Sequence, residues 1–416
     1  MKKIIFVLIL ILALCLPIFA TDLETAVEND EFLKEILISD IPVTYGDEAF
    51  RERILQRTEG KRDPIGLVLT GGSARACAHI GVLRYLDERG IVPDFIVSNS
   101  MGSIIGMLYA AGITPDQIEE ILRVGDISSY FALTLPSNGG FLDPSGFKAL
   151  IDYIVGEDYR MEETDIPVMV VCDDLVSKRE VRITEGPFTD VLVGSFALPV
   201  YFSPYKYNGH LLVDGGVISL APIDAAYEYT DTVILSTTFY DADTMNLINP
   251  VTILNSSFDI GKRQNASRDL KKYTDLIWIR CAVEQFSFMA FKDAATMADI
   301  GYSCTALESE KLEDLYKGQR TITSERSGEI ASRIQETKDN IHFFGRLKAT
   351  SFSQMLGVNF SGFDSYYLKN SMITGLKYRV LLGNWDMTAT FGFGSDTQNL
   401  SYTGGFSTIG GEISFY

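Results

Sequence analysis

Three short turns of this 416-residue chain carry the residue types that acyl transfer requires. They lie in the runs Leu67–Arg75 (LVLTGGSAR), Phe95–Gly102 (FIVSNSMG) and Val213–Gly216 (VDGG). Backbone N–H groups at a glycine-rich turn can stabilise a developing negative charge. A serine at the tip of a strand-to-helix turn is a candidate nucleophile, and an aspartate is a candidate base. The three turns must therefore meet in space if they form one site.

The second turn places a serine between two regular elements. Ile91–Val97 is a short apolar run typical of a strand, and Ser103–Ala111 is a small-residue run typical of a helix. Ser100 lies between them in a G-x-S-x-G pattern whose first position is Ser98. Ordinary strand-to-helix turns produce the same pattern by chance, so this match alone leaves both interpretations open.

The first turn has the same layout and supplies bare backbone. Ile65–Thr70 predicts a strand and Ala76–Arg89 a helix, with Gly71 and Gly72 between them. A glycine-rich turn of this kind also cradles phosphates in nucleotide-binding proteins. Neither a Gly-Lys-Ser/Thr sequence nor a G-x-G-x-x-G fingerprint is present, which disfavours a nucleotide site.

The three turns resemble motifs of a known family, the bacterial patatin-like phospholipases. The resembling segments are Gly71–Ala76 with His79–Leu83 (oxyanion motif and first helix), Ser98–Gly106 (nucleophile elbow) and Asp214–Val217 (Asp-Gly-Gly motif). The resemblance covers about residues 62–310. It implies a three-layer α/β/α sandwich with a mostly parallel sheet, followed here by a short all-β segment.

The resemblance also implies a role for each site residue. Ser100 would be the nucleophile and Asp214 the base of a Ser–Asp dyad. The N–H groups of three successive residues would form the oxyanion hole: Gly71, Gly72 and Ser73. Arg75 would support this loop or contact a lipid phosphate. The expected substrate is a phospholipid or another lipid ester at a membrane, with no cofactor and no metal.

This chain departs from the family pattern at three positions. Ser73 and Ala76 stand where the family usually has glycine, and Ser98 replaces the first glycine of the elbow. These changes motivate a second hypothesis, a non-catalytic surface binding or adhesion protein built on a decayed hydrolase scaffold. A third is a secreted protease or a non-lipid esterase on a related α/β fold.

The histidines favour a dyad over a Ser-His-Asp triad. The chain has only His79, His210 and His342, and none is placed like a triad base that follows an acid. Asp214 is therefore the economical base. Because Asp-Gly is also a common hairpin signal, a plain turn aspartate is the alternative at that position.

The N-terminal residues predict export. Residues 1–20 have a basic start, an apolar core and a small residue before Thr21, as in a signal peptide. A retained membrane anchor is the alternative, although the apolar run is shorter than a spanning helix needs. The expected location is the outer membrane, the periplasm or the cell surface. The net charge of −19 argues against a nucleic-acid partner.

We expect a leader at residues 21–61, containing a helix over Asp47–Arg57, and a hydrolase domain at residues 62–342. Within that domain, Gly139–Leu142 predicts a loop near the substrate, with Phe141 as a candidate acyl contact or a packing aromatic. The four cysteines beyond the signal peptide show no paired or metal-ligand spacing. Buried free thiols are expected, with a disulfide left open: Cys77, Cys172, Cys281 and Cys304.

The last segment, residues 343–416, differs in kind from the rest. It lacks Pro, Cys and His, is rich in aromatics, and alternates apolar with polar residues over what would be four or five strands. It resembles the terminal strands of outer-membrane β-barrel proteins. Because so few strands cannot close alone, a membrane form would need a homo-oligomer. The alternative is a small soluble sheet packed on the hydrolase domain.

Overall fold

The computed structural model describes residue 34 and residues 36–123, 130–133, 139–238, 250–320, 324–339, 352–363, 371–382, 385–396 and 405–415. The predicted signal peptide at residues 1–20 and His342 lie outside the described residues.

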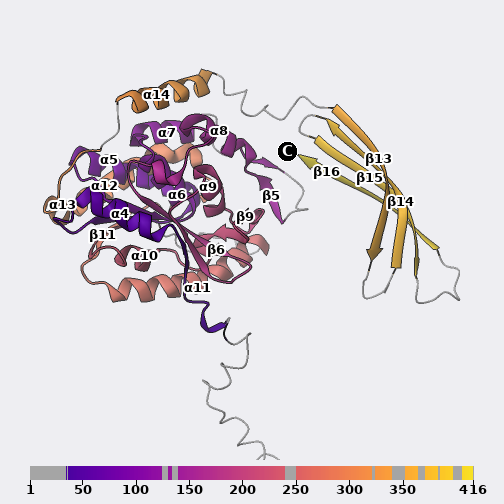
Figure 1. Cartoon of the computed structure of the whole chain (residues 1–416), viewed down its shortest axis with the longest axis horizontal. Coiled ribbons are helices and arrows are strands. Elements are labelled where there is room, and N and C mark those ends of the chain that lie inside the picture. Colours follow the sequence, from indigo (N-terminus) through magenta and orange to yellow (C-terminus); the bar gives the residue numbers. More distant parts are fainter. Residues whose placement is uncertain are drawn as a thin grey trace, which may run out of the picture.

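A nine-stranded, mostly parallel sheet forms the centre of the domain (Figure 1), with the main strand order β1-β7-β6-β3-β2-β11-β12. β10 pairs with β6 and β9 off this path. All neighbours in the main order run parallel except β6 and β7, while β10 is antiparallel to both of its partners. The strands are β1 (Val43–Tyr45), β2 (Ile65–Leu69), β3 (Phe95–Ser98), β6 (Val168–Asp174), β7 (Glu180–Ile183), β9 (Tyr205–Tyr207), β10 (His210–Asp214), β11 (Thr232–Thr237) and β12 (Ile277–Arg280).

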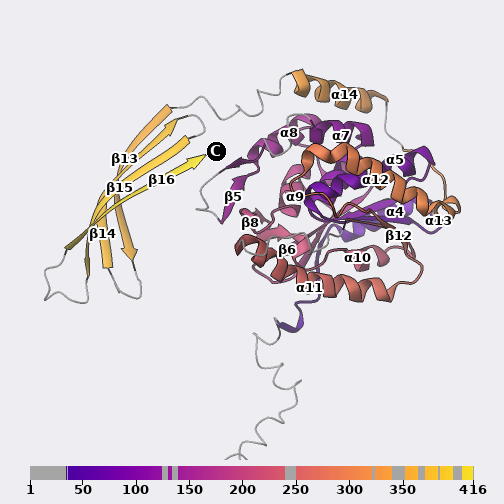
Figure 2. The same ribbon diagram turned by 180° about the vertical axis from the view of Figure 1, so that it is seen from behind.

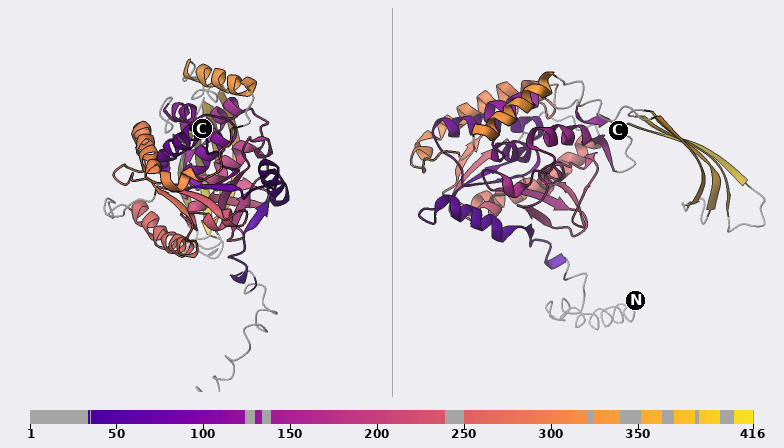
Figure 3. Two further views of the ribbon diagram at one scale, coloured as in Figure 1. Left: turned by 90° about the vertical axis from the view of Figure 1, so that its left-hand side faces the viewer. Right: turned by 45° about the horizontal axis from the view of Figure 1, so that its top comes forward.

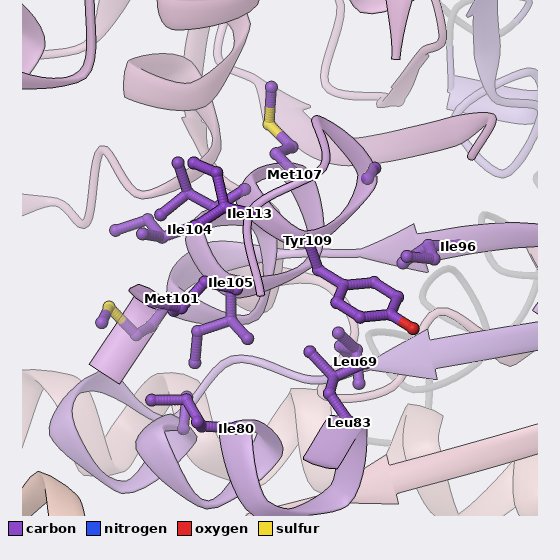
Figure 4. Close-up of a cluster of buried hydrophobic side chains, with 14 of the residues drawn as sticks. Leu69, Ile80, Leu83, Ile96, Met101, Ile104, Ile105, Met107, Tyr109 and Ile113 are labelled. Atoms are coloured by element: carbon purple, nitrogen blue, oxygen red, sulfur yellow. The ribbon is translucent and has the colours of Figure 1, made fainter. Parts of the chain in front are cut away.

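The central strands bury both faces, as expected for a parallel sheet covered by helices. In β2, Leu67 and Leu69 face one apolar core, while Val68 between them faces the other. β3 repeats this alternation, with Ile96 in the first core and Val97 in the second. Figure 4 shows part of the first core, where Leu69 and Ile96 of the sheet lie near side chains of the helices.

Helices cover each face, so the predicted three-layer α/β/α sandwich is confirmed. The first core is covered by α5 (Ala78–Glu88), α6 (Ser100–Ala110), α7 (Pro115–Arg123), α8 (Ser145–Val155), α9 (Phe188–Ser195), α12 (Ala294–Leu307), α13 (Ser309–Glu313) and α14 (Ser324–Asp339). The second is covered by α4 (Asp47–Thr58), α10 (Ile223–Tyr227) and α11 (Pro250–Lys272). Figures 1 and 2 show α14 and α11 along opposite edges of this domain, and Figure 3 gives two further views.

Short 3₁₀ turns and a second small sheet complete the domain. The turns are η1 (Ser73–Cys77), η4 (Met161–Glu163), η5 (Gly215–Val217) and η7 (Phe291–Asp293). The small sheet has the order β4-β5-β8, formed by β4 (Ala132–Leu133), β5 (Gly140–Asp143) and β8 (Val200–Phe202).

Two expectations on domain limits and loops are corrected. β1 pairs in parallel with β7, and Phe50 of α4 is buried against Phe95 of the sheet, so the domain begins before residue 62. The predicted leader therefore contains two elements of the domain. The predicted loop Gly139–Leu142 is largely strand, because β5 pairs with β4 and β8.

The C-terminal residues form a separate four-stranded antiparallel meander with the order β13-β14-β15-β16. Its strands are β13 (Phe352–Phe363), β14 (Ser371–Leu382), β15 (Trp385–Asp396) and β16 (Gly405–Phe415). The all-β character expected of this segment is thus present. None of the helices in the described residues has the length and apolar character that a membrane crossing requires.

Candidate active site

The strand register brings the second and third turns of the sequence together. Ser98 at the end of β3 is level with Val170 of β6, and two residues further along β6 lies Cys172. Cys172 pairs with Asp214, the last residue of the antiparallel strand β10. Ser100 lies two residues beyond Ser98. Ser100 and Asp214 therefore lie at the same level, at one edge of the sheet.

Ser100 and Asp214 are in direct contact. The Ser100 hydroxyl donates a hydrogen bond to Oδ2 of Asp214 at 2.5 Å. The other carboxylate oxygen, Oδ1, accepts the N–H of Gly216 at 2.8 Å. Only 3% of Asp214 is exposed, so its carboxylate is held between the serine and its own Asp-Gly-Gly turn. This arrangement can remove a proton from the serine without a histidine.

Ser100 occupies a strained position at the start of α6. Its φ of 54° lies in the left-handed region, which costs a non-glycine residue about 1–2 kcal/mol. The helix starts at the serine itself, three residues earlier than expected. Gly102 permits this, because a Cβ at that position would lie 2.4 Å from the carbonyl oxygen of Leu69. The elbow is therefore pressed against the end of β2.

The N–H of Gly71, one of the three predicted oxyanion donors, has a protein acceptor in this structure. Its N–H already donates to the side-chain oxygen Oδ1 of Asn99 at 2.8 Å. The Asn99 amide nitrogen donates in turn to the carbonyl of Ser219 at 3.0 Å. Gly71 matters instead through its lack of a side chain, since a Cβ there would lie 2.6 Å from Cβ of Ser100.

The backbone N–H groups of Gly72 and Ser73 are the two other predicted oxyanion donors. Both residues line the cavity beside Ser100, and in the described residues neither N–H has a hydrogen-bond acceptor. Gly72 has a φ of 151°, and a Cβ there would lie 2.2 Å from Oγ1 of Thr238. Ser73 has a φ of 51°, a conformation that glycine adopts more readily. The departure from glycine at Ser73 is thus accommodated, with some backbone strain.

Arg75 donates hydrogen bonds to two backbone carbonyls beside the cavity. Its Nε donates to the carbonyl of Phe286 at 2.8 Å, and a terminal nitrogen donates to the carbonyl of Glu284 at 3.2 Å. These bonds tie η1 to the segment that follows β12. Only 5% of Arg75 is exposed, so its guanidinium belongs to the wall of the site.

A cavity of about 510 Å³ opens beside Ser100. Its walls are mostly apolar and aromatic side chains, contributed by α6, the small sheet, α9, α11 and the segment after β12: Met101, Ile104, Leu142, Phe196, Phe202, Phe258, Phe286 and Phe288. Phe141, the predicted acyl contact, is 46% exposed and is not among the cavity-lining residues, whereas its neighbour Leu142 is. An apolar cavity beside this candidate nucleophile can take up a hydrocarbon chain.

Three ionisable side chains lie at or near the site: Asp214, Lys262 and Asp173. Burial raises the pKa of Asp214, opposed by the hydrogen bonds from Ser100 and Gly216 and by the positive charge of Lys262. Lys262 lines the cavity from α11 and forms an ion pair with Asp259. Asp173 of β6 lies nearby, and its Oδ2 accepts the N–H of Ile218 at 2.9 Å.

Burial also raises the pKa of Asp173 well above the ordinary value for an aspartate, and the neighbouring carboxylates raise it further. Both effects disfavour the charged form of Asp173 beside Asp214. The sequence patterns did not identify Asp173 as a residue near the site. Asn99 and Lys262 were also missed, because only the folded chain shows that they reach the site.

The two described histidines serve other contacts. His79 is fully buried, with Nε2 donating to the carbonyl of Thr70 and Nδ1 accepting from the hydroxyl of Ser236, both at 2.7 Å. His210 bonds Asp174 and Tyr45. Within the described residues, no hydrogen bond joins either histidine to Ser100 or Asp214.

The expectation of free cysteines can be compared with the same described part of the chain. All four cysteines there are free, and Cys77, Cys172 and Cys281 are buried. No group of three or more metal-ligating side chains is found in that part either.

Comparison with known proteins supports one family. Residues 67–227 match the family model described as patatin-like phospholipase. Patatin-like phospholipase domain-containing protein 7 of Rattus norvegicus is 29% identical over 245 residues, covering 55% of this chain and 18% of its own length. Patatin-like phospholipase domain-containing protein 6 of Homo sapiens is 30% identical over 224 residues, covering 52% of this chain and 16% of its own.

A bacterial relative is an uncharacterized NTE family protein of Mycobacterium tuberculosis, 32% identical over 170 residues, or 40% of this chain and 47% of that protein. The chain thus spans less than half the length of these relatives. The solved structure of VipD from Legionella pneumophila superposes with a TM-score of 0.43 and 13% identity, covering 68% of this chain and 75% of that one. That likeness is too distant to assign anything to this chain. Residues 67–227 are thus similar to patatin-like phospholipases, in the family model and in these relatives.

Proposed function

We propose that this chain hydrolyses the acyl ester bond of a phospholipid or another lipid ester. The observation that carries the proposal is the 2.5 Å hydrogen bond from Ser100 to the buried Asp214 at the wall of an apolar cavity. In this proposal Ser100 is the nucleophile, Asp214 is the base, and the N–H groups of Gly72 and Ser73 form the oxyanion hole.

The reaction has two halves. Oγ of Ser100 attacks the ester carbonyl while its proton passes to Oδ2 of Asp214. The oxyanion of the tetrahedral intermediate accepts hydrogen bonds from the N–H groups of Gly72 and Ser73. The ester C–O bond then breaks, and the leaving alkoxide takes the proton from Asp214. A water next attacks the acyl-enzyme and gives a proton to Asp214. Release of the fatty acid returns that proton to Oγ of Ser100.

The competing hypotheses fit the geometry less well. A decayed scaffold has no need to keep a strained serine against a buried carboxylate, or two unpaired N–H groups beside it. A protease would need room and hydrogen-bonding groups for an extended peptide, whereas the cavity walls here are mostly hydrocarbon.

The experiment is hydrolysis of dispersed phosphatidylcholine by the full chain, with release of fatty acid as the readout and Ser100→Ala as the inactive control. We expect turnover by the parent and a loss of about 10⁴-fold or more in the variant. Casein digestion and a short-chain ester are measured in parallel. Cleavage of casein, or of the short ester alone, would favour the third hypothesis, and no turnover of any substrate would favour the second.

Export and membrane attachment are also proposals. They rest on the pattern of residues 1–20 and on the composition of residues 343–416. Strands of 11 or 12 residues, as in β13–β16, have the length of membrane-crossing β-strands. Fractionation of cells that express the chain tests this. Recovery with the outer membrane and release only by detergent would support attachment, whereas recovery in the cytoplasm would contradict export.

A further inference from the structure

The apolar walls of the cavity continue onto the outer surface of the domain at three places. Phe258 of α11 and Met289 both line the cavity and are 40% and 49% exposed. Phe141 of β5 is 46% exposed beside the cavity-lining Leu142. A single exposed apolar side chain is ordinary, but three around one opening are not explained by packing.

The first half of α11 extends this rim. Ile253, Leu254 and Ile260 are 47%, 41% and 64% exposed, on the same helix as Phe258. With about 100° of rotation per residue, these four side chains fall within one arc of less than half the helix circumference. No charged residue occurs from Pro250 to Phe258.

The first two charged residues that follow on α11 are turned away from the solvent. Asp259 is only 6% exposed and pairs with Lys262, whose side chain is 13% exposed. The helix therefore turns its nearest ion pair inward and its large apolar side chains outward. A helix of a water-soluble surface normally has the opposite arrangement.

We propose that this rim docks on the surface of a lipid bilayer and delivers the substrate to Ser100. It consists of Phe141, Ile253, Leu254, Phe258, Ile260 and Met289. This inference rests on the proposed function, because a lipid ester resides in a bilayer and its hydrocarbon chain must pass from there into the cavity. If the rim enters the boundary between headgroups and acyl chains, the hydrocarbon chain of the lipid meets only apolar surroundings on its way from the bilayer into the cavity.

The charge of the chain specifies which bilayer fits. With a net charge of −19, attraction to an anionic membrane is not the driving force. The driving force is instead the insertion of apolar side chains, so the rim fits a zwitterionic surface such as phosphatidylcholine. Binding should then change little with salt, in contrast to the binding of a basic surface helix.

The test uses Ile253 and Ile260, which lie seven residues apart on one stripe of α11 and do not line the cavity. The variant is Ile253→Gln/Ile260→Gln, and the matched control is Leu307→Gln. Leu307 is 81% exposed at the end of α12, in the helical layer on the other face of the sheet. The parent, the double variant and the Leu307→Gln control are also made with Ser100→Ala, so that binding is measured without hydrolysis.

Flotation of the Ser100→Ala proteins with phosphatidylcholine vesicles measures docking. Losing two partly inserted isoleucines should weaken binding about tenfold or more, while Leu307→Gln should bind like the parent. With Ser100 intact, turnover on vesicles should fall in proportion, and turnover of a dissolved short-chain ester should stay within about twofold.

The docking proposal and the proposed function fail in different ways. Unchanged flotation and unchanged vesicle turnover in the double variant would overturn the docking surface while leaving the hydrolase intact. Equal losses on vesicles and on the dissolved ester would also overturn it, since the change would then act on the site itself. Self-association that depends on Ile260, with no vesicle binding, would assign the rim to a second copy. Absent hydrolysis with normal flotation would instead refute only the proposed function.

Discussion

The side chain of Asn99 holds the backbone of Gly71: Oδ1 of Asn99 accepts the Gly71 N–H at 2.8 Å, and its amide donates to the carbonyl of Ser219. One residue before the candidate nucleophile thus joins the oxyanion turn to the segment that follows Asp214. The three turns that carry the chemistry are cross-linked through a single buried amide.

Asn99→Asp tests this cross-link with little change in volume. The carboxylate can still accept from Gly71 but cannot donate to Ser219, and it places a buried negative charge beside Asp214. We expect a loss of about 10²-fold or more in kcat/KM on a dissolved ester, by analogy with the loss of one transition-state donor. Activity within threefold of the parent would show that the cross-link is dispensable.

The activity should fall on the acid side at a pH above the ordinary pKa of an aspartate. Asp214 must be ionised to accept the proton of Ser100, and burial raises its pKa. Lys262 lowers that pKa, so Lys262→Met should raise it and move the acid limb of kcat/KM to higher pH. Lys272→Met on the same helix is the control, because Lys272 pairs with Asp224 and does not line the cavity. An acid limb that does not move in Lys262→Met would contradict this assignment.

Asp173→Asn should retain activity, because burial and the neighbouring carboxylates raise the pKa of Asp173 and so disfavour its charged form, and the amide oxygen can still accept a hydrogen bond from the N–H of Ile218. Its effect on stability depends on pH. Because the folded pKa is raised, the unfolded chain releases this proton at lower pH than the folded one, and stability falls as pH rises through that range. Asp173→Asn removes this loss, so urea denaturation should show a larger gain in stability at pH 7 than at pH 4.

Asp173→Ala supplies the comparison for that experiment. It removes the acceptor of the Ile218 N–H and should lower kcat more than Asp173→Asn does. If Asp173→Asn is inactive while Asp173→Glu is active, a negative charge at this position is required, which would contradict the expectation that an uncharged side chain suffices there.

His79 should contribute to stability and not to the acid–base chemistry. Burial lowers its pKa to about 4, from an ordinary value near 6.5. Between these values the unfolded chain binds a proton that the folded chain does not, so this contribution to stability is lost as pH falls from about 6.5 to about 4. His79→Gln should flatten the dependence of stability on pH in that range.

In the same variant, kcat/KM at pH 7 should remain within about tenfold of the parent, since His79 bonds only Thr70 and Ser236 in the contacts described. Circular dichroism establishes that the protein is folded. Complete loss of turnover in a folded His79→Gln protein would revive a role for histidine in catalysis.

Local patterns predicted the elements that carry the chemistry. The strand expected at Ile65–Thr70 is β2, and the helix expected at Asp47–Arg57 is α4. Apolar runs bounded by glycine mark such elements because the same few residues decide both burial and turn formation. The three ordered motifs also pointed to the family that the comparisons support.

Pairings between distant segments could not be predicted from those patterns. Val43–Tyr45 joins the sheet only because β7, more than a hundred residues later, offers an edge for it. Gly140–Asp143 is strand only because β4 and β8 pair with it. In the same way, whether Gly71 is free to donate depends on where the side chain of Asn99 points, which no local pattern specifies.

The central claim is that Ser100 is the nucleophile. Its most direct test is to label the protein with a serine-directed fluorophosphonate and to identify the modified residue by peptide mass spectrometry. Attack by Oγ of Ser100 on phosphorus expels fluoride and leaves a stable phosphonyl ester. We predict one adduct per chain, on Ser100, with labelling of Asp214→Asn slower by about 10²-fold or more because the proton acceptor is lost. Absence of an adduct on Ser100, or labelling of Asp214→Asn at the parent rate, would contradict the account.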